Sequence, residues 1–216
     1  MRIIFFLFFL MCANFLTAQD TIKSKHYLFP DFSRGVVYYK EGAAVRHDMN
    51  YNLIMDEMQF INEKDKQAAF YDFDKVEYIS IGLRRFIPLD VDYAEVVMDT
   101  DEVALVLKRY TKVSGSTRGK VNKLLNNGEQ LADNVTLSSD STYYLVRLIK
   151  PKGIRKGIFK GLALSQNRVV EALYGGFLKV YSNHKAQIEK FIKEEGINFN
   201  NAHDIIRLAE YCFKLD

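Results

Sequence analysis

An alternation of apolar and polar residues over Met49–Ile61 places the strongest constraint on the fold of this chain. The stretch reads MNYNLIMDEMQFI, and every second residue of its first half is apolar, with Asn50 and Asn52 in between. Successive side chains of a strand point to opposite faces, so the pattern predicts one buried face and one wet face. Asp56 and Glu57 interrupt the run and predict the turn of a β-hairpin.

More short runs of the same kind surround this hairpin. The predicted strands are Gly35–Lys40, Ala69–Phe73, Val76–Gly82, Tyr93–Met98, Val103–Tyr110 and Thr142–Ile149. Short turns between successive strands favour an antiparallel β-meander, either a curved sheet or half-barrel, or an open sheet covered on one face. Pro88 cannot donate to a ladder and predicts an edge or a strand end. The polar stretch 114–141 is interpreted as a long connection or a protruding hairpin.

The last part of the chain has helical spacing. One helix is predicted after an N-cap at Ser165, through Val169 and Tyr174, and Gly175-Gly176 should break it. A second helix is predicted over Ala186–Glu195, and a third after an N-cap at Asn201. Two or three short helices cannot bury their apolar faces alone, so they should pack on the sheet or beside it. The predicted fold class is therefore α+β, with an antiparallel β-meander followed by C-terminal helices.

The N-terminal segment has the pattern of a secretory signal peptide. Residues 1–18 carry one arginine, an apolar run and a final Ala18, which predicts cleavage at that point and an exported protein, periplasmic or associated with the outer membrane. The alternatives are a retained membrane anchor and a lipoprotein acceptor at Cys12. After cleavage we expect a sheet domain over residues 19–149, and a basic connection with a helical subdomain over 150–216. No later stretch is long enough to span a membrane.

The net charge and the absence of known motifs limit the functions that we expect for this chain. The formal net charge of +3 falls to +2 when Arg2 is removed with the leader, which is too little to indicate nucleic acid or membrane binding. None of the four histidines lies in a metal-binding spacing, and no nucleophile elbow, P-loop or dinucleotide motif occurs. We therefore predict no catalytic residue, no metal site and no cofactor. Cys212, the last cysteine after cleavage, is predicted to be a buried, inert thiol.

One segment is unevenly charged. Tyr143–Arg168 contains many basic residues and neither Asp nor Glu. The candidate binding residues in it are Arg147, Lys150, Lys152, Arg155, Lys156 and Lys160. One interpretation is that they form a flexible basic loop suited to an anionic glycan or lipid, or to an envelope protein. The alternative is a solvated connection between sheet and helices. Because the chain is exported, nucleic acid is not an expected partner.

Several stretches together resemble a known group of proteins. They are the leader ending FLTAQD, the hairpin NYNLIMDEMQFI, the strands YISIG and AEVVMD, and the tail QIEKFIKEEGINFNNAHDIIRLAEYC. In these the chain resembles uncharacterised secreted proteins of Bacteroidetes. The resemblance implies no activity and no catalytic residue. The expected function is non-catalytic binding or scaffolding in the cell envelope; the alternatives are a small-ligand carrier with an apolar pocket in a barrel-like sheet and, third, a hydrolase.

Overall fold

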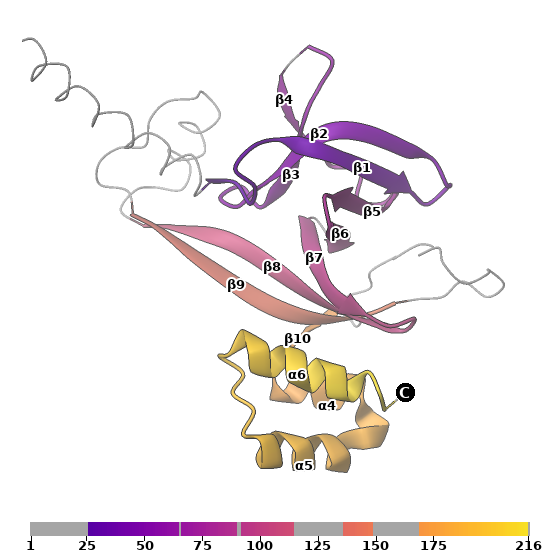
Figure 1. The fold of residues 1–216 in the computed structure, drawn as a ribbon, viewed down its shortest axis with the longest axis vertical. Helices are drawn as coiled ribbons and strands as arrows, with labels where there is room; N and C mark the ends of the chain where they lie inside the picture. The colour runs from indigo at the N-terminus through magenta and orange to yellow at the C-terminus, as the bar shows by residue number, and fades with distance from the viewer. Residues whose placement is uncertain (1–25, 65, 90–91, 115–135, 149–168, 216) are drawn as a thin grey trace, which may run out of the picture.

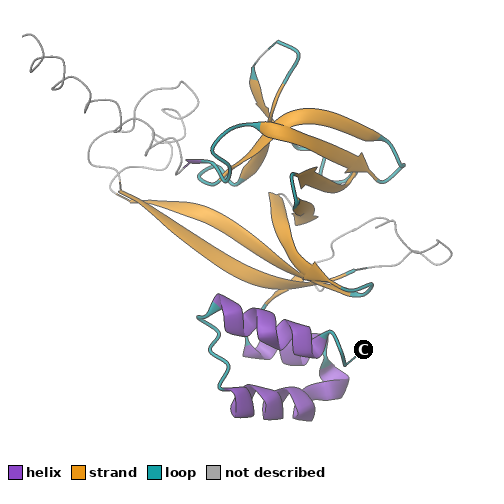
Figure 2. Cartoon of the chain, in the orientation of Figure 1, coloured by secondary structure: helices purple, strands orange, loops and turns teal. Residues whose placement is uncertain are grey.

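The structure, a computed structural model, describes residues 26–64, 66–89, 92–114, 136–148 and 169–215. Within these ranges one antiparallel sheet is followed by helices, as Figures 1 and 2 show, and the predicted α+β class is confirmed. The strands are β1 (Ser33–Tyr39), β2 (Ala44–Asn52), β3 (Glu57–Ile61), β4 (Gln67–Ala69), β5 (Val76–Ile81), β6 (Arg84–Leu89), β7 (Asp92–Asp99), β8 (Val103–Ser114), β9 (Thr136–Arg147) and β10 (Val169–Glu171). The predicted signal peptide lies outside the described residues.

The order of the strands departs from a simple meander at one place. The sheet runs β10-β9-β8-β7-β6-β5-β1-β2-β3-β4. Strands β1 to β4 and β5 to β10 are each neighbours in chain order, as expected for hairpin connections. However, β5 pairs with β1, from Gly35 opposite Ile81 to Tyr39 opposite Val76, and not with β4. The three-residue β4 stays at the edge, and a long-range pairing joins the two halves of the sheet.

The sheet splits between β5 and β6, next to Pro88. The pairing of β5 with β6 ends at Ile79 opposite Phe86, whereas β6 stays paired with β7 as far as Leu89. Pro88 therefore lies where β6 has a registered neighbour on one side, which is where a residue without an N–H group is tolerated. Of the two expectations at Pro88, the strand end is confirmed, because β6 ends one residue later, at Leu89; the edge is wrong, because β6 is an interior strand.

The long polar stretch between β8 and β9 is flanked by paired strands. The two strands pair continuously from Val103 opposite Arg147 to Ser114 opposite Thr136. Residues 136–141 of the polar stretch therefore belong to β9, and the choice between a connection and a protruding hairpin for the rest of it stays a prediction. Residues 115–135 lie outside the described part.

The curvature of the sheet brings the turn between β2 and β3 against β8. The backbone N–H of Thr111 on β8 donates to the carbonyl of Leu53 at 2.7 Å. Lys108, also on β8, makes ion pairs with Asp56 of that turn at 2.7 Å and with Asp92 of β7. Burial opposes the charge of Lys108, but hydrogen bonds to the two aspartates outweigh it and raise the pKa of the lysine. The sheet is curved in this way without closing into a barrel.

Both faces of the sheet carry buried side chains. The hollow of the curved half holds Tyr51, Phe86 and Tyr93 among the residues of one core cluster. A second cluster joins the helices to Val103 and Leu105 of β8. A third lies on the other face of β6 to β9. Because the interior of the curved half is filled by large side chains, it is a packed core.

Asn50 and Asn52 do not face solvent, and the expectation of a wet polar face on β2 is wrong there. They are only 1% and 3% exposed. The Asn50 side chain accepts hydrogen bonds from the backbone N–H groups of Phe29 and Tyr51, and donates to the carbonyls of Phe29 and Asp31. It replaces ladder bonds where the segment before β1 leaves the sheet, and this satisfies buried backbone groups.

Asn52 has a different partner set from Asn50. Its side-chain oxygen accepts from the N–H groups of Ile54 and Met55 and so shapes the turn between β2 and β3. The predicted turn at Asp56 and Glu57 accordingly lies earlier, over residues 53–56. Asn50 and Asn52 are both buried because their side chains take the place of backbone groups as hydrogen-bond partners.

The segment after residue 168 differs from the predicted helix. Residues Val169–Glu171 form β10, which pairs with β9, so the helical assignment there is wrong. Gly175 and Gly176, expected to break a helix, lie inside α4 (Tyr174–Val180). Gly176 is required by close packing, because a Cβ there would overlap the carbonyl oxygen of Glu171. The expected N-cap Ser165 lies outside the described residues.

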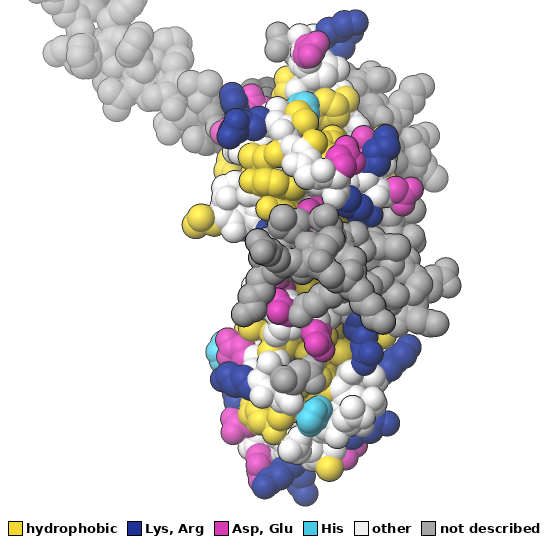
Figure 3. Space-filling model, turned by 90° about the vertical axis from the view of Figure 1, so that its right-hand side faces the viewer, with side chains coloured by type: hydrophobic (Ala, Val, Ile, Leu, Met, Phe, Trp, Pro, Cys, Tyr) yellow, Lys and Arg dark blue, Asp and Glu magenta, His cyan; other side chains and the backbone are white. Residues whose placement is uncertain are grey.

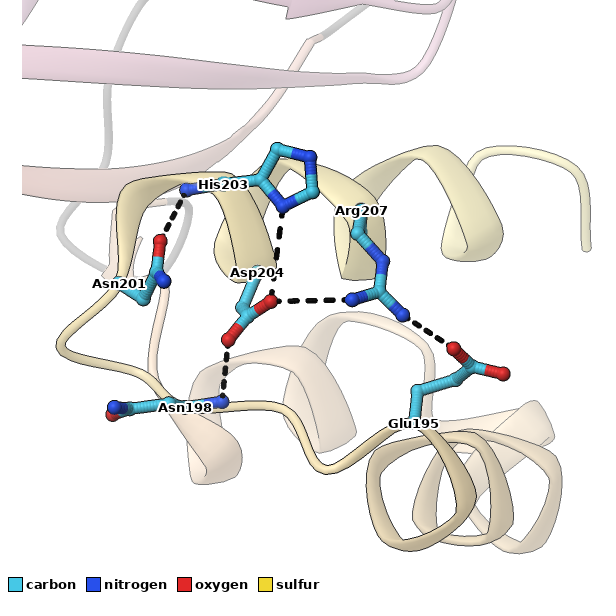
Figure 4. Close-up of polar contacts among 6 residues, drawn as sticks. All are labelled: Glu195, Asn198, Asn201, His203, Asp204 and Arg207. Atoms are coloured by element: carbon cyan, nitrogen blue, oxygen red, sulfur yellow. Dashed lines mark hydrogen bonds and ion pairs between the residues drawn. The ribbon is translucent and has the colours of Figure 1, made fainter.

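The remaining helices agree with the sequence. After the short helix η2 (Ser182–His184), α5 (Lys185–Glu195) ends at Gly196 in the left-handed conformation, and α6 (Ala202–Cys212) follows. Figure 4 shows the connection: the Asn201 side chain caps α6 by accepting from the His203 N–H, and Arg207 joins Asp204 to Glu195. The ion pair of Arg207 with Glu195 joins α6 to α5, and the Asn201 cap stabilises the start of α6. Cys212 is fully buried, as predicted.

The surface is mixed in character. In Figure 3, Lys and Arg alternate with Asp and Glu over the helical part, and hydrophobic side chains gather over the part formed by the first strands. Leu83 in the turn between β5 and β6 and Tyr71 are exposed apolar residues of that part. Among the residues that the structure describes, no helix is both long and apolar enough to cross a membrane.

Candidate functional site

A polar cavity lies where the sheet meets the helices. Its volume is about 450 Å³. Its walls come from three separate segments: the turn between β7 and β8, the end of β9, and the junction of α4 with η2. The lining residues are Glu102, Val103, Arg147, Leu148, Val180, Tyr181, Ser182, Asn183 and His184. Cavities that combine a few polar groups with an apolar wall are the usual places for small ligands or for a partner's side chain.

The turn that carries Glu102 is shaped by a threonine. The Thr100 hydroxyl oxygen accepts from the N–H groups of Glu102 and Val103, and the Thr100 N–H donates to the Val103 carbonyl. Threonine favours such turns because its hydroxyl can replace a backbone acceptor. The Leu148 N–H then donates to the Glu102 carbonyl at 2.6 Å. This extends the pairing of β8 and β9 by one step and holds Glu102 at the rim.

Arg147 forms the wall between sheet and helix. It lies opposite Val103 in the register of β8 and β9, and its guanidinium donates to the carbonyl of Val180, the last residue of α4. A cation at this end satisfies a carbonyl that has no partner within the helix and complements the helix dipole. Arg147 therefore docks α4 onto the sheet, and its charge stays at the edge of the cavity.

The opposite wall is made by η2. Tyr181 is buried, and its carbonyl accepts from the His184 N–H at 2.9 Å, which tightens the chain into one 3₁₀ turn. The His184 Nδ1 atom lies 2.9 Å from the Gln187 side-chain oxygen. The residues that line the cavity thus include Glu102, Arg147 and His184, together with exposed Ser182 and Asn183. This set can form hydrogen bonds to a ligand of either charge.

The described residues do not include a metal site. No group of three or more His, Cys, Asp or Glu side chains in this part of the chain is placed to hold a metal ion.

The structure places one of the six candidate binding residues at this cavity. Arg147 is there, at the end of β9, although its partner is a helix carbonyl. The other five, Lys150, Lys152, Arg155, Lys156 and Lys160, lie outside the described residues. Sequence reasoning missed Glu102, Ser182, Asn183 and His184. No spacing or motif joins these residues, because they come together only when the helices pack on the sheet.

Comparisons with protein-family models, curated proteins and solved structures found no match to this chain. The fold and the geometry of the cavity therefore carry the functional argument.

Proposed function

We propose that this chain is a non-catalytic binding or scaffolding protein of the cell envelope, and that the cavity around Arg147 is its contact site. The observation that carries the proposal is the cavity itself, an open hollow of about 450 Å³ that residues of three chain segments line beside a hydrophobic core cluster. A polar cavity at the junction of two structural layers suits a polar ligand or a polar side chain of a partner.

The location in the envelope rests on the leader. Residues 1–18 have the composition of a signal peptide, and the chain resembles secreted proteins of Bacteroidetes. Sequencing the N-terminus of the protein recovered from the periplasm or the outer membrane tests this part. We expect the mature chain to begin at Gln19. An N-terminus at Met1 would contradict the cleavage.

The alternatives receive less support from the described residues. A carrier for apolar ligands needs an apolar pocket inside the curved sheet, and there Tyr51, Phe86 and Tyr93 are packed together. A ligand would have to displace them. A hydrolase needs a base directed by a neighbouring group toward a nucleophile. In the described part of the chain, the His184 Nδ1 atom contacts the Gln187 side-chain oxygen.

The binding role is tested by crosslinking from the cavity. A photoreactive amino acid is placed at Ser182, which lines the cavity and is exposed, and at Lys193, which is exposed on α5 and serves as the matched control. The mature chain carrying each probe is irradiated in the native envelope. We expect a defined adduct at position 182 and none at 193. Equal labelling at both positions, or none at 182, would contradict a contact site in the cavity.

A further inference from the structure

A second polar cluster lies on the sheet away from the cavity residues, around Glu95 of β7. Arg84 of β6 approaches it from one side, with its Nε atom 3.5 Å from the Glu95 Oε1 atom. Arg109 of β8 approaches from the other side and contacts Oε2. The register explains this placement, because Glu95 lies opposite Phe86 and Leu107. Arg84 lies two residues before Phe86 and Arg109 two residues after Leu107, so both are on the face of Glu95 and approach it from opposite directions along the strands.

The cluster has one positive charge in excess. Two guanidinium groups share a single carboxylate, and Glu95 is the most buried of the three, with 13% of its side chain exposed. Arg84 and Arg109 are 41% and 33% exposed, so a ligand in solvent can reach both. Burial lowers the pKa of Arg109, and the neighbouring charge of Arg84 lowers it further, which is the expected effect of two like charges held close together.

The hydrogen-bonding capacity of Arg84 is also incompletely used. Its Nη1 atom is buried and has no hydrogen-bond partner among the described residues. The guanidinium carbon lies 5.3 Å from the centre of the Phe29 ring, which holds the plane of the group over an aromatic face. A buried donor without a partner is costly, particularly on a charged group. The contact with Phe29 holds Arg84 in place, while 41% of its side chain stays exposed to solvent.

We propose that Arg84 and Arg109 form a binding site for an oxyanion, the carboxylate or phosphate group of a ligand. Guanidinium groups present paired N–H donors whose spacing matches two oxygens of one oxyanion. Glu95 neutralises one of the two positive charges and fixes both side chains, and the bound anion neutralises the other. The site shares no residue with the cavity around Arg147, so it stands or falls independently of the proposed function.

Titration with inorganic phosphate tests the site directly. The mature chain is labelled with ¹⁵N, and the arginine Nε–Hε signals are followed by NMR while phosphate is added at constant ionic strength. We expect saturable shifts at Arg84 and Arg109. Arg84→Gln should weaken binding at least tenfold. The matched control, Arg46→Gln, removes the same charge from an exposed position on β2 and should leave the affinity unchanged.

Removal of the Glu95 carboxylate should strengthen phosphate binding, whereas removal of an arginine should weaken it. Glu95→Gln raises the local charge excess from one to two, so phosphate should bind about fivefold more tightly. If this variant does not fold, Arg109→Gln takes its place and should weaken binding as Arg84→Gln does. The absence of a saturable shift in the unmodified chain would overturn the proposal. Equal weakening by Arg46→Gln and Arg84→Gln would also overturn it, because binding would then follow net charge alone.

The choice of probe distinguishes the ligands that could supply the oxyanion. Acetate and glucuronate share a carboxylate, and inorganic phosphate and glycerol phosphate share a phosphate group. Tighter binding of glucuronate than of acetate, in a manner that depends on Arg84, supports the site and identifies an acidic saccharide. Tighter binding of glycerol phosphate than of inorganic phosphate supports it equally and identifies a lipid headgroup.

Discussion

Replacement of Asn50 by alanine should destabilise the protein by about 3 kcal/mol. The side chain is 1% exposed and accepts from the N–H groups of Phe29 at 3.1 Å and Tyr51 at 2.8 Å. It donates to the carbonyls of Phe29 at 2.9 Å and Asp31 at 3.2 Å. Asp31 is exposed, so its carbonyl regains water. The other three groups lose their partner, at about 1 kcal/mol each, the low end of the range for buried polar groups.

Urea unfolding followed by far-ultraviolet circular dichroism measures this loss, since the chain has no tryptophan. The melting temperature should fall by about 6–12 °C for a domain of this size. Asn200→Ala is the control, because Asn200 is exposed between α5 and α6, and it should change stability by less than about 0.5 kcal/mol. A loss below about 1 kcal/mol for Asn50→Ala would refute the reasoning, because water would then replace the side chain at little cost.

Three further predictions concern single residues of the described fold. Gly176→Ala should cost about 1–3 kcal/mol through overlap with the preceding strand, whereas Gly175→Ala, with open space around it, should be neutral or stabilise by up to about 1 kcal/mol in thermal unfolding. Lys108→Met should cost about 2 kcal/mol at neutral pH by leaving two aspartates without their cation. Because the pKa of Lys108 is raised in the folded protein, its contribution to the free energy of unfolding is fully present below its ordinary pKa of 10.5 and is lost as the pH rises through the higher folded value. The stability curves of the unmodified chain and of this variant should therefore converge at that high pH. Asn201→Ala should remove the cap of α6 and cost about 1 kcal/mol in urea unfolding, and no change would mean that another group caps the helix.

The elements that the sequence predicted well are those whose signals are local. Alternation predicted β7 and β8, and the cap at Asn201 and the glycine at 196 predicted the helical pair at the end of the chain. Period, caps and turn residues act within a few positions, so they can be recognised without knowing what packs nearby. The class of fold followed from their order along the chain.

The predictions from sequence were wrong where contacts with a distant segment outweigh the local sequence pattern. Val169 and its neighbours have helical spacing, but the free edge of β9 pairs with them as β10. Gly176 is a poor helix former by propensity, but it is required where α4 passes against β10. Asn50 has the position of a solvent-facing residue, and the segment before β1 buries it. In each case tertiary contacts outweigh propensities of about 1 kcal/mol per residue or less.

The candidate sites could be predicted only in small part. Arg147 was selected for its place in a basic segment, and the structure shows that it docks a helix at a polar cavity. Nothing in the sequence relates it to Glu102 or His184. Arg84 and Arg109 are likewise 25 positions apart, and only the strand register brings them to one carboxylate.

By itself the sequence determined the α+β class and the positions of most strands and of the last two helices, while the signal peptide over residues 1–18 stays a prediction. These depend on periodicity and composition, which act along the chain. The tertiary structure alone decided the pairing of β1 with β5, the burial of the two asparagines, and the side chains that surround the cavity and Glu95. The physical reason is that packing and pairing energies arise between segments that are remote in sequence, and one sequence read alone does not specify which segments meet.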